Sequence, residues 1–174
     1  MDNSRAIWEG VYRAGRQVNR LPYPEPFSFF FSHFGGDLAG RSLLEIGCGA
    51  GNNLVFAART LGMEVSGIDQ SEAAIGHARG FFEAAGARPR MLAAGDAANL
   101  DLADNAVDCV LDRACLQHNR LEALPPILAE VRRVLKPGGF FYSMLISEEH
   151  QLFGLGTDLG GGDFHNAEND GTRH

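Results

Sequence analysis

From residue 42 onward, short apolar runs alternate with longer segments that carry a helical pattern of apolar residues. The apolar runs are 42–46, 63–68, 90–94, 106–111 and 138–146, and the helical segments between them include 52–62, 71–86 and 123–135. Strands that alternate with helices pair in parallel, because each helix carries the chain back across the sheet. The sequence therefore predicts an α/β fold with a doubly wound, mostly parallel sheet that helices cover on both faces.

The segments on either side of this core have a different composition. Residues 1–40 combine a predicted short helix over 8–18 with three closely spaced prolines and a group of phenylalanines, which indicates a helical cap. Residues 149–174 are rich in glycine and acidic residues, so we expect a mobile tail. With 174 residues in total, the sequence predicts one domain with its α/β core over 41–148.

The charge balance restricts the classes of partner. Fifteen Lys and Arg against 22 Asp and Glu give a net charge of −7, and no basic cluster stands out. Nucleic acids and anionic membranes reward basic surfaces, so neither is expected as a partner. No apolar run approaches the roughly 20 residues of a membrane span. Three cysteines and an N-terminus without a secretion pattern favour a cytoplasmic protein.

A glycine-rich turn follows the first predicted strand. The sequence LLEIGCGAGNN places Gly47, Cys48, Gly49 and Gly51 between this strand and a helix that begins near Asn52. Backbone without Cβ atoms turns sharply there, under the N-terminus of a helix, and a flat polar ligand can lie against it. The pyrophosphate-binding pattern of dinucleotide enzymes requires its third glycine at the sixth position, and here the glycine stands at the fifth.

Acidic residues lie within or at the end of the first three predicted strands. Glu45 lies in the first strand, Asp69 ends the second, and Asp96 ends the third. Because parallel strands end at the same edge of a sheet, the three carboxylates converge beside the glycine turn. A carboxylate in the position of Asp69 can accept hydrogen bonds from both hydroxyls of a ribose. Three acids without a phosphate-binding cation favour a neutral or cationic nucleoside as the ligand.

These motifs resemble class I S-adenosylmethionine-dependent methyltransferases of the methyltransferase 11 or 25 type. The resemblance covers about residues 42–147 and rests on EIGCGAG, GIDQS, GDAANL and EVRRVLKPGGFF in that order. It implies the Rossmann-like class I methyltransferase fold and S-adenosylmethionine, becoming S-adenosylhomocysteine, as cofactor. It further implies methyl transfer to a small-molecule acceptor by in-line displacement. The cofactor residues that follow from it and from the turn are Glu45, Gly47, Cys48, Gly49, Gly51, Asn52, Asp69, Gln70, Asp96 and Ala97.

The resemblance extends more narrowly to WEGVYRAGRQVNRLPYPEP and LDRACLQHN, as in a bacterial subgroup whose acceptor is unassigned. Two alternatives to a methyltransferase stay open: a catalytically silent module that binds S-adenosylmethionine, and a nicotinamide-dependent oxidoreductase.

The segment after the fourth predicted strand supplies the candidates for catalysis. Asp112 and Arg113 are expected to face the same crevice and to bind the cofactor. Asp112 or His118 is the candidate general base for an acceptor proton. A histidine that only lines the pocket is the open alternative. Asp112, Cys115 and His118 recur every three residues, but one such group without a second cluster does not predict a metal.

The first predicted helix carries Trp8, Tyr12 and Arg16 on one stripe. These side chains are expected to form a lid over the sulfonium end of the cofactor, where aromatic faces favour a cation. The alternative is that the stripe packs the cap onto the core.

The resemblance also implies further strands after the last predicted one, yet residues 149–174 contain no periodic apolar segment that could form them. We therefore expect either that the natural chain continues past His174 or that the exposed sheet edge is covered in a homodimer.

Overall fold

The computed structural model describes residues 4–147, 149–150, 153–166 and 171–173. The helices are α1 (Ser4–Arg13), α2 (Pro24–His33), α3 (Asn52–Thr60), α4 (Glu72–Ala84) and α5 (Leu124–Val134), with short 3-10 turns η1 (Leu116–His118) and η2 (Leu121–Ala123). The strands are β1 (Ser42–Ile46), β2 (Glu64–Asp69), β3 (Met91–Ala94), β4 (Val107–Arg113), β5 (Leu135–Met144), β6 (Thr157–Gly160), β7 (Asp163–Asn166) and β8 (Gly171–Arg173).

The first five strands form one parallel sheet in the order β3-β2-β1-β4-β5. The chain builds outward from β1 through β2 to β3, and then returns to place β4 on the other side of β1. Doubly wound sheets bind ligands beyond the carboxyl ends of their strands, where this reversal opens a crevice. The predicted α/β, Rossmann-like fold is confirmed, and the crevice lies beyond β1 and β4.

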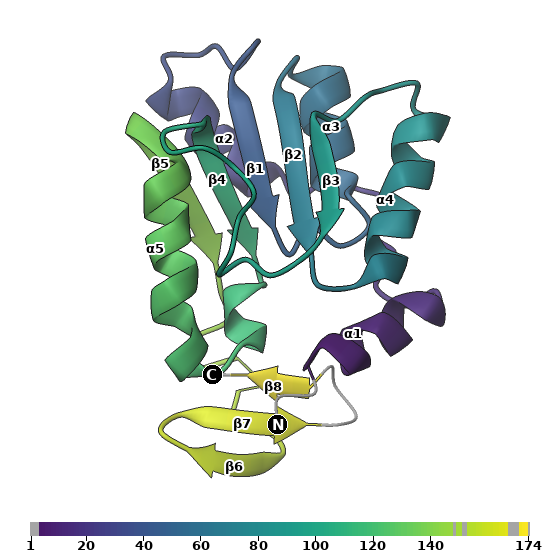
Figure 1. The fold of residues 1–174 in the computed structure, drawn as a ribbon, viewed down its shortest axis with the longest axis vertical. Helices are drawn as coiled ribbons and strands as arrows, with labels where there is room; N and C mark the ends of the chain where they lie inside the picture. The colour runs from purple at the N-terminus through teal and green to yellow at the C-terminus, as the bar shows by residue number, and fades with distance from the viewer. Residues whose placement is uncertain (1–3, 148, 151–152, 167–170, 174) are drawn as a thin grey trace.

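The core has one layer on each face of the sheet. Successive residues of β1 point to opposite faces, so Leu43 packs in the layer with α2, α3 and α4, and Leu44 packs in the layer with α5. Figure 1 shows α5 in front of the sheet and α2 and α3 behind it. Because both faces are covered, β1 is buried along its whole length, as is usual for the central strand of a parallel sheet.

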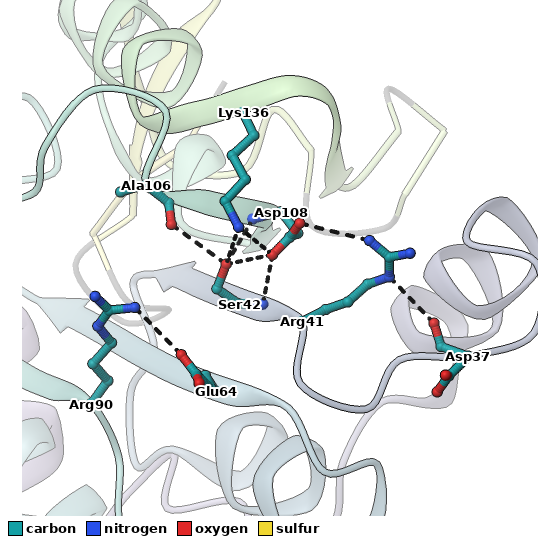
Figure 2. A network of polar contacts seen from close by, with 8 residues as sticks. All are labelled: Asp37, Arg41, Ser42, Glu64, Arg90, Ala106, Asp108 and Lys136. Carbon is teal, nitrogen blue, oxygen red and sulfur yellow. Dashed lines mark hydrogen bonds and ion pairs between the residues drawn. The ribbon is translucent and has the colours of Figure 1, made fainter.

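A polar cluster closes the amino ends of the central strands, opposite the crevice (Figure 2). Asp108 accepts hydrogen bonds from the backbone nitrogen and the hydroxyl of Ser42, at 2.9 and 2.6 Å, and from Lys136 Nζ at 2.8 Å. Burial alone would raise the pKa of Asp108, but the hydrogen bonds from Lys136 and Ser42 outweigh it and lower this pKa to about 2. The cluster joins β1, β4 and β5 at one end and leaves their carboxyl ends to the site.

The N-terminal cap differs from the prediction in one respect. The first helix ends at Arg13 rather than near residue 18, and the chain then turns through Gln17 with a φ of 56°. Arg16 therefore lies outside the helical stripe of Trp8 and Tyr12, and it is exposed. The prediction that Arg16 shares one helical stripe with Trp8 and Tyr12 is wrong, because the spacing argument assumed a helix that continued past Gly15.

The segment after β5 also differs from the expected tail without regular structure. Strands β6, β7 and β8 form a separate antiparallel sheet, which none of the five parallel strands joins. Asp163 ties it to the core by accepting a hydrogen bond from the backbone nitrogen of Leu121 at 3.2 Å. The strands are short and largely polar, so backbone pairing forms them without the apolar alternation that sequence patterns detect. Figure 1 shows this sheet beyond the carboxyl ends of the parallel strands, beside α1.

Within the part of the chain that the structure describes, no helix has the length and apolar character required to cross a bilayer.

Candidate functional site

A cavity of about 860 Å³ opens at the carboxyl ends of the parallel strands. Its walls come from α1, from the segment that precedes α2, and from the residues that follow β1, β2, β3 and β4. Most of the predicted site residues line it: Trp8, Tyr12, Glu45, Gly47, Cys48, Gly49, Asn52, Asp69, Gln70, Asp96, Ala97, Arg113 and His118. Arg16, Gly51 and Asp112 are not among the lining residues.

The glycine turn is shaped by close neighbours. A Cβ atom on Gly49 would collide with the hydroxyl of Tyr12, and one on Gly47 would collide with the side chain of Cys115. Both glycines also have positive φ, 63° at Gly47 and 53° at Gly49, which disfavours other residues. Gly51 has a different role, because it begins α3 and packs against Ala78 of α4.

Asp69 lies at the end of β2 with its carboxylate against the glycine turn. Its oxygens accept hydrogen bonds from the backbone nitrogens of Gly49 and Ser71, both at 2.9 Å. Burial is the main influence on this group and raises the pKa of Asp69. Each oxygen of a carboxylate can accept a second hydrogen bond, so the group can still bind two hydroxyls from the cavity.

Asp96 and Ala97 line the cavity beyond β3. Asp96 is exposed, and it accepts a hydrogen bond from the backbone nitrogen of Ala98 at 2.8 Å. Ile68 and Ala98 add apolar surface beside it. A carboxylate at the edge of an apolar wall suits a planar base with an exocyclic amine.

Glu45 is 2% exposed, and its carboxylate faces the cavity from β1. Asn53 donates a hydrogen bond to Oε1 at 2.7 Å, while Oε2 has no hydrogen-bond partner among the described residues. Burial raises the pKa of Glu45 to about 8. Arg113 ends the adjacent strand β4, and its guanidinium stacks 3.9 Å from the centre of the Tyr23 ring.

Two aromatic residues of α1 and a histidine line one side of the cavity. The ring of Trp8 meets His118 edge to face at 4.8 Å between centroids, and lies 6.0 Å from the ring of Tyr12. Glu9 fastens this helix to α4, because it accepts hydrogen bonds from the hydroxyl of Ser71 and the backbone nitrogen of Ala73. The aromatic pair therefore lines the cavity from a helix that is bonded to α4.

Asp112 does not face the crevice as predicted. It is fully buried, and Oδ1 accepts hydrogen bonds from the backbone nitrogens of Cys115 and Leu116 while Oδ2 accepts one from the hydroxyl of Ser143. These bonds shape the turn after β4, and Asp112 is not among the residues that line the cavity. The expectation that Asp112 faces the crevice is therefore wrong, and its predicted roles as general base and cofactor residue lose the placement on which they rested.

Tyr23 and Asn53 line the cavity and were not among the predicted residues. Asn53 directly follows the predicted Asn52, and it is 2% exposed. A polar residue that begins a helix beside a glycine turn is a usable signal for Asn53. Tyr23 comes from a proline-rich segment far away in sequence, which gives no comparable signal.

A protein-family model described as "Methyltransferase domain" matches residues 43–139. The chain belongs to the S-adenosylmethionine-dependent methyltransferases. A Mycolicibacterium smegmatis protein named a probable S-adenosylmethionine-dependent methyltransferase is 34% identical over 75% of this chain and 47% of its own length. A sterol 24-C-methyltransferase of Gibberella zeae is 29% identical over 82% of this chain and 42% of its own.

The fold is likewise that of solved methyltransferases. The 1,6-didemethyltoxoflavin-N1-methyltransferase of Burkholderia thailandensis, solved with S-adenosylhomocysteine bound, superimposes with a TM-score of 0.65 at 24% identity, over 79% of this chain and 58% of that one. The chain spans about half the length of the curated relatives that it matches.

Proposed function

We propose that this methyltransferase binds S-adenosylmethionine in the cavity at the carboxyl ends of β1–β4 and transfers its methyl group to a small-molecule acceptor. The observation that carries the proposal is the row of groups along this edge. Asp96 follows β3, Asp69 ends β2 and Glu45 lies in β1, beside a glycine turn that admits close approach of a ligand. In this order, the three carboxylates suit the adenine, the ribose and the ammonium group of S-adenosylmethionine.

When bound, S-adenosylmethionine supplies a methyl group on a positively charged sulfur, which a nucleophile displaces in line. The residues of this chain then have two main tasks: to hold the acceptor opposite the sulfur and to exclude water. Trp8 and Tyr12 present aromatic faces at the cavity, which favours a cation and keeps water out.

His118 is our candidate for the proton of a hydroxyl acceptor. It lines the cavity beside Trp8, in the 3-10 turn η1 that follows β4, and imidazole titrates near neutral pH. With an acceptor in hand, His118→Ala should lower kcat by roughly 100-fold while the affinity for S-adenosylhomocysteine stays unchanged. An equal loss in kcat and in the affinity for S-adenosylhomocysteine would instead indicate that His118 only lines the pocket. An amine or thiol acceptor needs no such base.

Calorimetry with S-adenosylhomocysteine and with NAD tests the cofactor. We expect binding of the first and none of the second, because the glycine pattern lacks the spacing for a pyrophosphate. Binding of NAD alone would favour an oxidoreductase. A panel of small-molecule acceptors with methyl-labelled cofactor then separates an enzyme, which transfers label, from a silent module that only binds.

A further inference from the structure

The titratable groups that line the cavity are divided by sign between its walls. The acids come from the wall built by β1, β2 and β3: Glu45, Asp69 and Asp96. The arginine and histidine side chains come from α1 and from the residues that end or follow β4 and β5: Arg5, Arg113, His118 and His150. Among the described residues, no acid from this second group of elements lines the cavity. Two parts of one ligand site therefore differ in electrostatic character.

The proposed function assigns the three acids to the cofactor, which leaves the basic part of the cavity to the acceptor. Arg113 ends the strand next to β1 and stacks on Tyr23, and its charge acts on Glu45. It therefore lies at the border between the two parts. Arg5, His118 and His150 come from elements that contribute none of the lining acids.

Contacts of η1 connect α1 to this basic part. The ring of Trp8 meets the ring of His118 edge to face, with 4.8 Å between centroids. Arg5 precedes Trp8 by three residues in α1, and side chains three apart in a helix are neighbours. Arg5 and His118 therefore both lie beside the same tryptophan.

The segment after β5 is joined to η1 as well. The buried side chain of Gln117 accepts a hydrogen bond through Oε1 from the backbone nitrogen of Ile146 at 2.9 Å. The backbone nitrogen of His150 donates to the carbonyl oxygen of Ser147 at 2.9 Å, which keeps His150 close to the end of β5. The hydrogen bond from Ile146 to Gln117 thus fixes where the segment that carries His150 leaves the sheet.

The three side chains lie at different depths. His118 is 9% exposed, whereas Arg5 and His150 are exposed at the surface. Trp8 and Ile146 add apolar surface to the same cavity. Guanidinium and imidazole N–H groups bind carboxylate and phosphate oxygens through charge-assisted hydrogen bonds. This combination suits a small molecule with an apolar body and an anionic group.

The mouth of the cavity has the same sign. Residues 4–20 hold four arginines and a single acid, in a chain whose net charge is −7. Gln17 and Asn19 of this segment line the cavity. A local excess of positive charge attracts anions to an opening in a protein that otherwise repels them. The positively charged sulfur of S-adenosylmethionine adds to this attraction.

We propose that the methyl acceptor is a small molecule that carries an anionic group, a carboxylate or a phosphate, in addition to the atom that is methylated. Arg5 and His150 bind this group at the rim of the cavity, and His118, which is more deeply buried, remains the candidate for the acceptor proton. This inference rests on the proposed function, since it names the chemical class of the acceptor for the same site.

The test measures binding, so it does not require a known acceptor. The protein is saturated with S-adenosylhomocysteine, and calorimetry gives the affinities of benzoate, phenyl phosphate and benzamide. Benzamide has nearly the shape of benzoate without its charge. We expect benzoate or phenyl phosphate to bind at least about tenfold more tightly than benzamide, as expected for hydrogen bonds to a charged group. The anion that binds more tightly identifies the recognised group as a carboxylate or a phosphate.

Two variants assign this preference to residues. Arg5→Gln and His150→Ala should each reduce the preference for the anion over benzamide by about fivefold or more, because each removes a donor to the anionic group. Arg59→Gln is the matched control and should keep the full preference. Arg59 is an exposed arginine in the last turn of α3 and is not among the residues that line the cavity.

Several outcomes would overturn the proposal. Benzamide could bind as tightly as both anions, none of the three probes could bind the saturated protein, or Arg5→Gln could retain the full preference. An Arg5→Gln variant that lost S-adenosylhomocysteine and benzoate to the same extent would assign Arg5 to the cofactor, and would also overturn it. In each case, binding of S-adenosylhomocysteine by the wild type would leave the proposed function intact. A wild type that did not bind S-adenosylhomocysteine would contradict the proposed function itself.

Discussion

A substitution of Asp69 tests the proposed cofactor site most directly. Asp69→Ala should weaken S-adenosylhomocysteine by about 10- to 100-fold, because two hydrogen bonds from ribose hydroxyls to a charged acceptor disappear. Calorimetry measures the effect, and circular dichroism checks that the variant folds, since Asp69 also accepts from Gly49 and Ser71. Asp101→Ala, an exposed acid outside the cavity, is the control. An unchanged dissociation constant in a folded Asp69→Ala variant would refute the ribose assignment.

Glu45 predicts a pH dependence of stability. Burial raises the pKa of Glu45 from 4.5 to about 8 in the folded chain, so the folded state holds this proton when the unfolded state has lost it. Its contribution is fully present below pH 4.5 and is lost as the pH rises toward 8. Without cofactor, the Tm of the wild type should therefore fall relative to Glu45→Gln across this window, by about 3 °C or more. A constant difference in Tm between the two proteins would contradict the raised pKa.

The sequence predicts which strand ends carry acidic residues, but it does not predict the direction of each side chain. Glu45, Asp69 and Asp96 were predicted at the cavity because strand ends in a parallel sheet meet at one edge, and they line it. Asp112 follows the same rule in sequence but points into the turn after β4, where backbone donors reach it first. Side-chain direction at a strand end depends on the turn that follows, and no spacing rule gives that.

At the scale of elements, α1 is held over the cavity mainly by Glu9. Its carboxylate accepts from Ser71 Oγ at 2.7 Å and from the backbone nitrogen of Ala73 at 3.1 Å, at the start of α4. The hydrogen bond from Ser71 is the main reason that the pKa of Glu9 is lowered to about 2, so the contact persists at neutral pH. The helix α1 is therefore anchored to the start of α4, the helix that follows Asp69.

Glu9→Ala should loosen the contact between α1 and α4, because both hydrogen bonds from α4 to the Glu9 carboxylate are lost. We expect S-adenosylhomocysteine to dissociate several-fold faster, because changes in affinity appear mainly in the dissociation rate. We also expect the backbone amides of Ser4–Arg13 to exchange faster with deuterium. Stopped-flow measurements and hydrogen exchange test the two effects. Glu72→Ala is the control, because it alters an exposed acid in the first turn of α4. Equal dissociation rates in Glu9→Ala and the wild type would show that α1 does not gate the cavity.

Elements with their own apolar period were predictable, and those formed by pairing alone were not. The helix over 124–134 lies within one residue of its predicted bounds, because prolines begin it and its apolar residues recur at helical spacing. The sheet of β6, β7 and β8 was missed, since its strands are held by backbone pairing and by Asp163 rather than by an apolar face. The first helix was predicted too long because a stripe of side chains says little about where a helix ends.

At the scale of the whole molecule, the strand order leaves β5 with β4 on one side and no strand of the described residues on the other. An unpaired edge exposes backbone donors and acceptors that can pair with another chain. Apolar surface lies beside it, in a hollow of about 800 Å³ lined by residues that include Leu128, Leu135 and Phe141. Leu128 is 42% exposed although it belongs to α5.

We therefore propose that this chain self-associates through β5 and the adjoining hollow. Light scattering over a series of concentrations should give a mass that rises toward that of a dimer, because pairing the edge and burying the hollow stabilise the same contact. Leu128→Lys should shift the series back toward the monomer, since it places a charge in the apolar hollow. Leu21→Lys is the control, because Leu21 is 80% exposed but lies outside the hollow. A wild-type chain that stays monomeric at the highest concentration would exclude this edge as an interface.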